Sequence, residues 1–421
     1  MTELTLDRLR SAVSNDAAIR RVRRMQPVGG QGDKIFPPTY PGATNNDPPR
    51  HVFERRRLEG HDRLCVLIDS VQSQANRLEE ALRDVRSRVG FPVISVDFSG
   101  TEVDDIPAIT TLDAPHRVFD AIIRDSQLGK TPFKDTDQGK ELVRAKSSDA
   151  TAVFKLSPST LVFGAWNSTG EGGGLGAKFP RTVVSEIIGI GVAQEPGASV
   201  TATPRGRELT LTLGDSEGGV PSGKRTGSRI DPLGIRASVK VYKNPNGDWT
   251  FDKKKGAKEV KPSEVNHSNI APTVQDLGVT CDYALHTQVL SCAALRRLRF
   301  QGKNPDLANE TARTVLAALG LVATVAQDSA GYFLRSRCDL VPESGDAPFE
   351  IVRADGSTEL VQLTLDLAVK LFADAVKAAK SAGVPWNEED LVLTPQEKLV
   401  ELVSESRKKA LEGAAEAATE E

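Results

Sequence analysis

The chain has 421 residues, of which 39% are apolar, 26% charged and 5% aromatic, and its formal net charge is −3. This length gives room for one elaborated domain or for two to three domains of about 100–200 residues, and the composition excludes wholesale disorder, a collagen-like fibre and an integral membrane protein. No apolar run approaches the roughly 20 residues of a membrane span, and the start MTELTLDRLR lacks the basic-then-apolar order of a signal peptide. We therefore expect a cytoplasmic protein.

The first regular feature is a basic segment followed by a long loop. Residues 17–28 carry four arginines, interleaved with apolar side chains. Six prolines and four glycines then fall between Gln26 and Pro49, which predicts irregular structure.

The expected regular elements alternate between strands and helices. Apolar residues at helical spacing follow a short strand, Leu64–Ile68, and end at Gly90, so this region is predicted to form a β-α-β unit with Phe91–Phe98. Asn304 and Pro305 are suited to the N-cap and first turn of a later helix. The other predictions are a helix from about Pro115, strands at Leu161–Trp166, Val183–Val192, Tyr283–Leu290, Tyr332–Leu340 and Phe349–Arg353, and a helix at Leu363–Lys380.

A basic, glycine-rich insertion separates two parts of the predicted core. Between Ala193 and Thr273 the chain is rich in Gly, Pro, Lys and Arg. Its one clear local signal is a turn-forming tetrapeptide, Asn244–Gly247, flanked by Ala237–Tyr242 and Trp249–Phe251, which predicts a projecting β-hairpin.

The element pattern favours an α+β sandwich with large loops over a doubly wound sheet, because no long series of parallel βα repeats is present. We place the first part of the core at residues 1–192, the insertion at 193–273, the remainder of the core at 274–380 and an acidic tail at 381–421. The tail holds ten acidic and four basic side chains, so the rest of the chain carries a positive net charge. This asymmetry fits a body that meets a phosphate backbone and a tail that is solvated or meets a basic partner.

Cysteine, histidine and serine patterns give little support for metal or enzyme chemistry. The four cysteines form no CxxC pair, the five histidines form no HxxxH or HxE pattern, and there is no GxSxG motif. Gly218, Gly223 and Lys224 fit the start of a phosphate loop, GxxxxGK. Arg225 then replaces the hydroxyl residue that would bind magnesium, and Pro221 interrupts the loop. We expect no metal, no other cofactor and no catalytic residue.

The most unusual segment is glycine-rich. Five of the seven residues from Gly170 to Gly176 are glycine, and polar and basic side chains lie on both sides. Free backbone N–H groups there would hold phosphates, assisted by Asn167, Ser168, Lys178 and Arg181. The alternative is a flexible connection between two strands.

Several motifs resemble one protein family. They are HRVFDAIIRDSQ (116–127), LVFGAWNSTGEGGGLGAKFPR (161–181), VNHSNIAPT (265–273), CDYALHTQVLSCAALRRLRF (281–300) and GYFLRSRCDLV (331–341). They resemble the repeated backbone subunit of type I-G (formerly I-U) CRISPR effector complexes, the Cas-seven family of the RAMP superfamily. The resemblance extends from roughly Arg20 to Leu340 and leaves out the acidic tail.

The resemblance implies an RRM-like, ferredoxin-type core with large loop insertions and a projecting β-hairpin thumb. It also implies a non-catalytic subunit that oligomerises head to tail along a guide RNA (crRNA) and presents it to target DNA, so that base pairing reads sequence and protein reads backbone. The further partners implied are the other Cascade subunits, namely the crRNA-processing or cap subunit and the large subunit, and a recruited helicase-nuclease. No membrane is involved.

A subunit that accepts any guide sequence needs phosphate and 2′-hydroxyl contacts and must leave the Watson–Crick edges free. We predict RNA contacts at Arg20, Arg21, Arg23, Arg24, Lys34, Asn167, Ser168, Gly172, Gly173, Lys178 and Arg181. The insertion is our first choice for the thumb, with thumb or DNA contacts at Lys224, Arg225, Lys240, Lys243, Lys253, Lys254 and Lys255.

One alternative comes from related type III subunits, which cut target RNA with an aspartate on the loop after the first strand. Asp33 lies in a broadly similar place, but its neighbours Gly32 and Lys34 supply no general base. The alternative function is a RAMP-type endoribonuclease.

Overall fold

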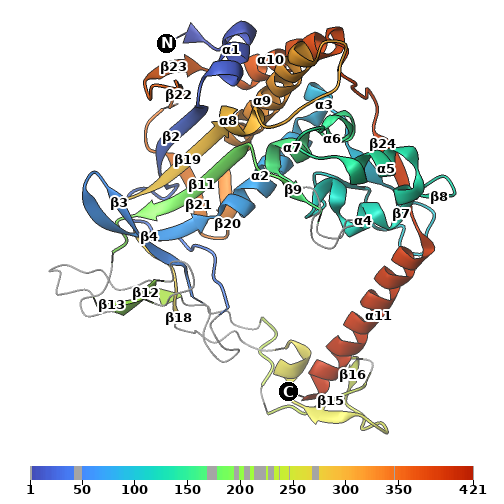
Figure 1. Ribbon diagram of the computed structural model, residues 1–421. Coiled ribbons are helices and arrows are strands. Elements are labelled where there is room, and N and C mark those ends of the chain that lie inside the picture. Colours follow the sequence, from blue (N-terminus) through green and yellow to red (C-terminus); the bar gives the residue numbers. More distant parts are fainter. Residues whose placement is uncertain are drawn as a thin grey trace.

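The computed structural model describes residues 2–41, 50–167, 178–193, 199–202, 209–212, 224–225, 232–236, 238–245, 247–267, 275–345 and 347–420 (Figure 1). Over these residues the chain combines helices with a large, mostly antiparallel sheet and several smaller sheets. The predicted α+β class is confirmed. Across the same residues, no helix has both the length and the apolar character that crossing a membrane would require.

The large sheet has ten strands, and β2 and β19 lie near its centre. Its main path runs β1-β23-β22-β2-β19-β11-β4-β3, with β21 also paired to β2 and β20 paired to β21. Every pairing is antiparallel except that of β1 with β23. The strands are β1 (Thr2–Glu3), β2 (Ala18–Pro27), β3 (Phe53–Leu58), β4 (His61–Asp69), β11 (Val183–Ile190), β19 (Tyr283–Ser291), β20 (Tyr332–Arg335), β21 (Cys338–Pro342), β22 (Phe349–Val352) and β23 (Thr358–Gln362).

Helices cover one face of this sheet. α2 (Val71–Asp84) and α9 (Pro305–Ala330) pack against each other, and α2 also contacts β11. α1 (Leu6–Asn15) and α10 (Leu365–Ser381) pack on α9, as Figure 1 shows. Because α9 lies between the sheet and these outer helices, most of its residues are buried. Among the residues that the structure describes, no helix covers the opposite face of the sheet over β2, β19 and β11.

The predicted start of α9 is confirmed. The Asn304 side chain accepts the backbone N–H groups of Asp306 and Leu307, and Pro305 takes the first helical position, where a missing N–H costs nothing. The expected helix over 363–380 is also present, as α10.

A second sheet joins segments that are far apart in the sequence. It has the order β6 (Ile109–Thr110), β5 (Ile94–Val96), β24 (Leu391–Pro395), β7 (Ser126–Leu128) and β8 (Thr131–Pro132). β5 pairs parallel with β24, and so it does not lie in the same sheet as β4. The predicted β-α-β unit is therefore wrong in its last strand, because the partner of β5 comes from the carboxyl-terminal region, which no local pattern reveals.

Two other local predictions need correction. The apolar run at 161–166 forms the short helix α7 (Ser159–Phe163) and only then the strand β9 (Ala165–Trp166), since a short buried run has no decisive period. The helix expected from Pro115 is reduced to a 3-10 turn, η1 (Arg117–Phe119), and a single α turn, α4 (Ala121–Arg124). Asp120 separates them, and its side chain caps α4.

The predicted hairpin in the insertion is confirmed for the described residues. β15 (Val241–Lys243) pairs with β16 (Trp249–Thr250), and β17 (Lys258–Val260) adds a third strand. The other elements are α3 (Arg86–Val89), η2 (Phe133–Asp135), α5 (Asp137–Arg144), α6 (Thr151–Leu156), β10 (Lys178–Phe179), β12 (Ser199–Ala202), β13 (Leu209–Thr212), β14 (Lys224–Arg225), η3 (Pro262–Val265), β18 (Gln275–Asp276), α8 (Cys292–Leu295) and α11 (Glu397–Glu420).

Candidate nucleic-acid interface

The four arginines of β2 point to two sides of the large sheet. Side chains alternate along a strand, so Arg21 and Arg23 face the helices while Arg20 and Arg24 face the uncovered side. Arg21 is only 4% exposed and Arg23 only 7%. The arginine run is therefore divided between the interior and the surface.

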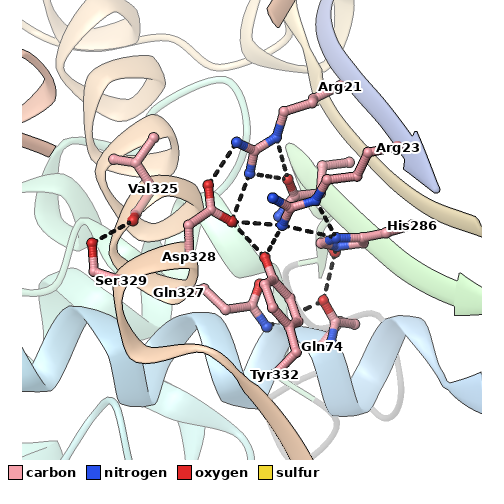
Figure 2. Close-up of polar contacts among 11 residues, drawn as sticks. Arg21, Arg23, Gln74, His286, Val325, Gln327, Asp328, Ser329 and Tyr332 are labelled. Atoms are coloured by element: carbon pink, nitrogen blue, oxygen red, sulfur yellow. Dashed lines mark hydrogen bonds and ion pairs between the residues drawn. The ribbon is translucent and has the colours of Figure 1, made fainter. Parts of the chain in front are cut away.

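Asp328 of α9 holds the two inward arginines. Its carboxylate lies 2.6 Å from a guanidinium nitrogen of Arg21 and 2.6 Å from one of Arg23, and the Tyr332 hydroxyl donates to it at 2.5 Å (Figure 2). Arg21 also donates to the Gln288 amide oxygen at 2.7 Å. Both guanidinium groups are buried among protein partners and contribute to the packing of β2 on α9, and their RNA contacts stay a prediction.

His286 of β19 belongs to the same group of polar side chains as Arg23 and Asp328. Because a guanidinium only donates, Arg23 fixes Nδ1 of His286 as an acceptor, at 3.2 Å, so the neutral ring carries its proton on Nε2, 2.9 Å from Ser185 Oγ. Burial, together with the charges of Arg23 and Arg21, lowers the pKa of His286 well below its usual value. The imidazole is therefore neutral inside the fold.

The outward arginines remain near solvent. Arg20 pairs with Glu350 at 2.6 Å, and the Arg24 guanidinium lies 4.1 Å from the centre of the Tyr283 ring. Lys34 is half-buried in the loop after β2. These three residues stay in the predicted RNA-binding set as surface groups.

A groove lies beside the segment that the sequence singled out. β9 and β10 pair as a two-stranded ribbon, Lys178 opposite Trp166 and Phe179 opposite Ala165, at the two ends of residues 168–177. The groove next to this ribbon has a volume of about 610 Å³. It is lined by Pro115, His116, Arg117, Phe163, Gly164, Ala165, Trp166, Lys178, Phe179, Pro180 and Arg181. Two predicted contacts, Lys178 and Arg181, thus come together. Ser168, Gly172 and Gly173 lie outside the described residues, and Asn167 is buried at the ribbon's edge.

The groove's back wall requires a glycine. Gly164 has φ +80°, and a Cβ there would lie 2.8 Å from the Phe179 carbonyl oxygen and 2.9 Å from the Arg181 nitrogen. Only glycine lets these two backbones approach so closely. The Gly164 carbonyl in turn accepts a hydrogen bond of 2.8 Å from Arg117.

Arg117 is held rigidly behind the groove. Its guanidinium makes a bidentate pair with the buried Glu79, at 2.6 and 2.7 Å, and its backbone is left-handed, with φ 53°. Burial raises the pKa of Glu79 to about 7 even though Arg117 opposes the shift. Both carboxylate oxygens of Glu79 accept hydrogen bonds from Arg117, whereas Arg181 interacts with Glu79 only through charge.

Arg181 is the second arginine near Glu79, and Glu79 accepts its hydrogen bonds from Arg117. Burial, with a contribution from Arg117, lowers its pKa. Its Nε is buried and has no hydrogen-bond partner among the described residues. A buried donor without an acceptor is costly, which makes Arg181 a candidate for an anionic partner.

Trp166 supplies the groove's aromatic surface. Its side chain is 50% exposed, and the Lys178 Nζ lies 4.7 Å from the centre of its ring. Our sequence analysis missed Trp166, His116 and Arg117 as site residues. The signal available was their position in the motifs 116–127 and 161–181 that carry the family resemblance.

Five of the seven cations predicted in the insertion lie in or next to its three-stranded sheet. Lys240 pairs with Glu259 at 2.6 Å, and Lys243 donates to the Glu264 carbonyl at 3.3 Å. Lys253, Lys254 and Lys255 are exposed. Lys224 and Arg225 form β14. Whether these residues contact DNA or form the thumb stays a prediction.

Asp33 is exposed in the loop after β2, and one of its carboxylate oxygens accepts the Lys34 backbone N–H at 2.9 Å. Throughout the described part of the chain, no group of three or more His, Cys, Asp or Glu side chains is arranged to hold a metal ion.

Comparison with known proteins finds a family model that is similar to part of the chain. Residues 19–194 match a family model described as CRISPR-associated protein GSU0053 (Cas_GSU0053). This match confirms the resemblance to a CRISPR-associated family that the motifs indicate, and it includes every residue of the groove. Among solved structures, the crystal structure of Thermofilum pendens Csc2 is similar at 11% sequence identity over 99% of this chain and 85% of its own, with a TM-score of 0.26. No curated protein matches the chain.

Proposed function

We propose that this chain is a non-catalytic backbone subunit that binds guide RNA in a type I CRISPR interference complex and presents it for pairing with target DNA. One observation carries the proposal. The groove that joins Arg181, Lys178 and Trp166 lies within residues 19–194, the part that matches a CRISPR-associated family.

The strand order supports an RRM-like core. β2, α2, β11, β19, α9 and β22 occur in this order along the chain, with further elements inserted between them, and their strands lie in the order β22-β2-β19-β11. This is the order of a β-α-β-β-α-β fold, with both helices on one face and one face of the sheet open. RRM modules bind single-stranded RNA on that open face. Arg20 and Arg24 lie on the corresponding face here.

The chemistry of the groove suits a partner of any sequence. Arg and Lys side chains recognise phosphates through charge, which carries no base information. Arg181 and Lys178 are such groups, and His116 is an exposed third member of the lining. A subunit that must accept every guide needs contacts of this kind.

The partners follow from the resemblance. We propose that copies of this chain pack head to tail along the crRNA, with the crRNA-processing or cap subunit and the large subunit at the ends or side of the filament. Target DNA pairs with the guide, and a separate helicase-nuclease cuts it. The insertion around β15, β16 and β17 is the candidate thumb.

Titration of the full-length chain with single-stranded RNAs of unrelated sequence tests the proposal. We expect similar affinities for all of them, a steep loss of affinity with added salt, and nuclease protection that grows in equal steps as protein is added. Failure to bind any RNA at low salt would overturn the proposed function.

The same reactions with magnesium address the alternative endoribonuclease. Cleavage at a regular spacing, abolished in Asp33→Ala, would replace our proposal with that activity. Uncut RNA in a protected, multimeric complex is the outcome that we expect.

A further inference from the structure

Trp166 differs from the other two tryptophans in what surrounds it. Trp386 packs on Phe154 with ring centres 5.2 Å apart, and Trp249 lies 5.7 Å from Phe251. Trp166 has a cation over its ring and half of its surface exposed. A large aromatic side chain left open in a groove points to a ligand that covers it.

The backbone that carries Trp166 is held in place before any ligand arrives. Phe179, which pairs with Ala165 in the ribbon, is buried and stacks on Phe119 with an angle of 8° between the rings. The close approach at Gly164 and the hydrogen bond from Arg117 fix the chain just before Trp166. The backbone of the ribbon therefore needs little ordering on binding, which saves conformational entropy.

The surroundings of the ring define the ligand. Lys178 and Arg181 line the same groove as Trp166, so a flat apolar surface lies beside two positive charges. A cationic ligand would be repelled by them. Every nucleotide has a flat, weakly polar ring joined to a phosphate. It therefore matches both the aromatic surface of Trp166 and the positive charges beside it.

We propose that Trp166 is a stacking platform for one unpaired base of the bound RNA, while Arg181 takes an adjacent phosphate. This inference rests on the proposed function and assigns the ligand of its groove. The groove volume of about 610 Å³ lies in the range of small-ligand sites. The base is held by its face, so any of the four bases is accepted.

Tryptophan fluorescence of the full-length chain tests the platform directly. Saturating single-stranded RNA should quench the emission of the unaltered protein and of Trp386→Phe, which lies outside the groove and the insertion, and the quenching should largely disappear in Trp166→Phe. The phenylalanine variant keeps an aromatic ring and should still bind RNA, whereas Trp166→Ala should bind roughly 5- to 100-fold more weakly.

An abasic oligonucleotide separates stacking from phosphate binding. It keeps the sugar-phosphate chain and lacks the bases, so Trp166→Ala should weaken the binding of RNA and leave that of the abasic chain unchanged. Arg181→Ala should weaken the binding of both.

The failure of this inference is distinguishable from failure of the function. RNA binding that is as tight in Trp166→Ala as in the unaltered chain, with quenching retained in Trp166→Phe, would overturn the platform and leave the RNA-binding role intact. Equal losses of affinity for RNA and for the abasic chain in Trp166→Ala would overturn it too. A chain that binds no RNA at all would instead overturn the proposed function.

Discussion

Two arginine pairs in this protein each lie near a single carboxylate and differ in how that carboxylate is shared. Arg21 and Arg23 of β2 share the carboxylate of Asp328, and both guanidinium groups are buried with acceptors. Arg117 and Arg181 also lie near one carboxylate, yet Glu79 is bound by Arg117 alone. Arg181 keeps a buried nitrogen without a partner.

The difference shows that the number of acceptors decides the role of an arginine cluster. In the first pair the acceptors are complete, so the cations stabilise the packing of the sheet on α9. In the second pair one cation is in excess, and a bound phosphate would supply the missing acceptor. Charge density in the sequence does not separate the two cases.

Removing the shared carboxylate tests the first pair and should give the largest effect. Asp328→Asn leaves Arg21 and Arg23 facing each other without an anion, and breaking a buried pair in this way costs about 3–5 kcal/mol. Urea denaturation should show a marked fall of the midpoint. Asp366→Asn, which removes only an exposed pair with Arg88, is the matched control and should change little. Loss of RNA affinity in Asp328→Asn with unaltered stability would reverse the roles of the two pairs.

The histidine beside the first pair adds a pH dependence. The unfolded chain takes up a proton at His286 below about pH 6.5, whereas the folded chain does not, because the pKa of the buried ring is lowered. Folding stability should therefore fall as the pH decreases below about 6.5, by about 1.4 kcal/mol per pH unit for this group. His286→Gln should have a shallower slope between pH 6.5 and 5 when the free energy of unfolding is measured at each pH. Equal slopes in the two proteins would show that His286 is protonated in the folded state.

Removing Arg181 tests the role of the second pair, Arg117 and Arg181. Arg181→Ala deletes a buried donor that has no acceptor, so the free protein should be as stable as before or more stable. RNA affinity should fall on the order of tenfold, because a charge-assisted contact to phosphate is lost. Denaturation midpoints and filter-binding titrations measure the two quantities. A destabilised variant with unchanged RNA affinity would make Arg181 a structural residue like Arg21.

The two arginine pairs also show which features of the fold can be predicted from the sequence. The Asn304–Pro305 helix start and the β15–β16 hairpin follow from local signals, because capping and turn formation act over few residues. The burial of Arg21 and Arg23 depends on Asp328, about 300 residues away in the chain. Which face of a strand meets such a partner is set by tertiary packing, and the same holds for β5 and β24.

Lys178→Ala should give the smallest of these effects. It tests whether the groove binds RNA through phosphate charge alone or also recognises bases. Lys178 is exposed, so its removal should leave stability unchanged and weaken all RNAs alike. For single strands each lost phosphate contact reduces the slope of log affinity against log salt by about 0.7. Lys370→Ala, an exposed lysine on α10 outside the groove, should leave that slope as it is. If Lys178→Ala instead changed the preference among RNA sequences, the lysine would contact a base. The groove would then recognise the sequence of the guide RNA and not only its phosphates.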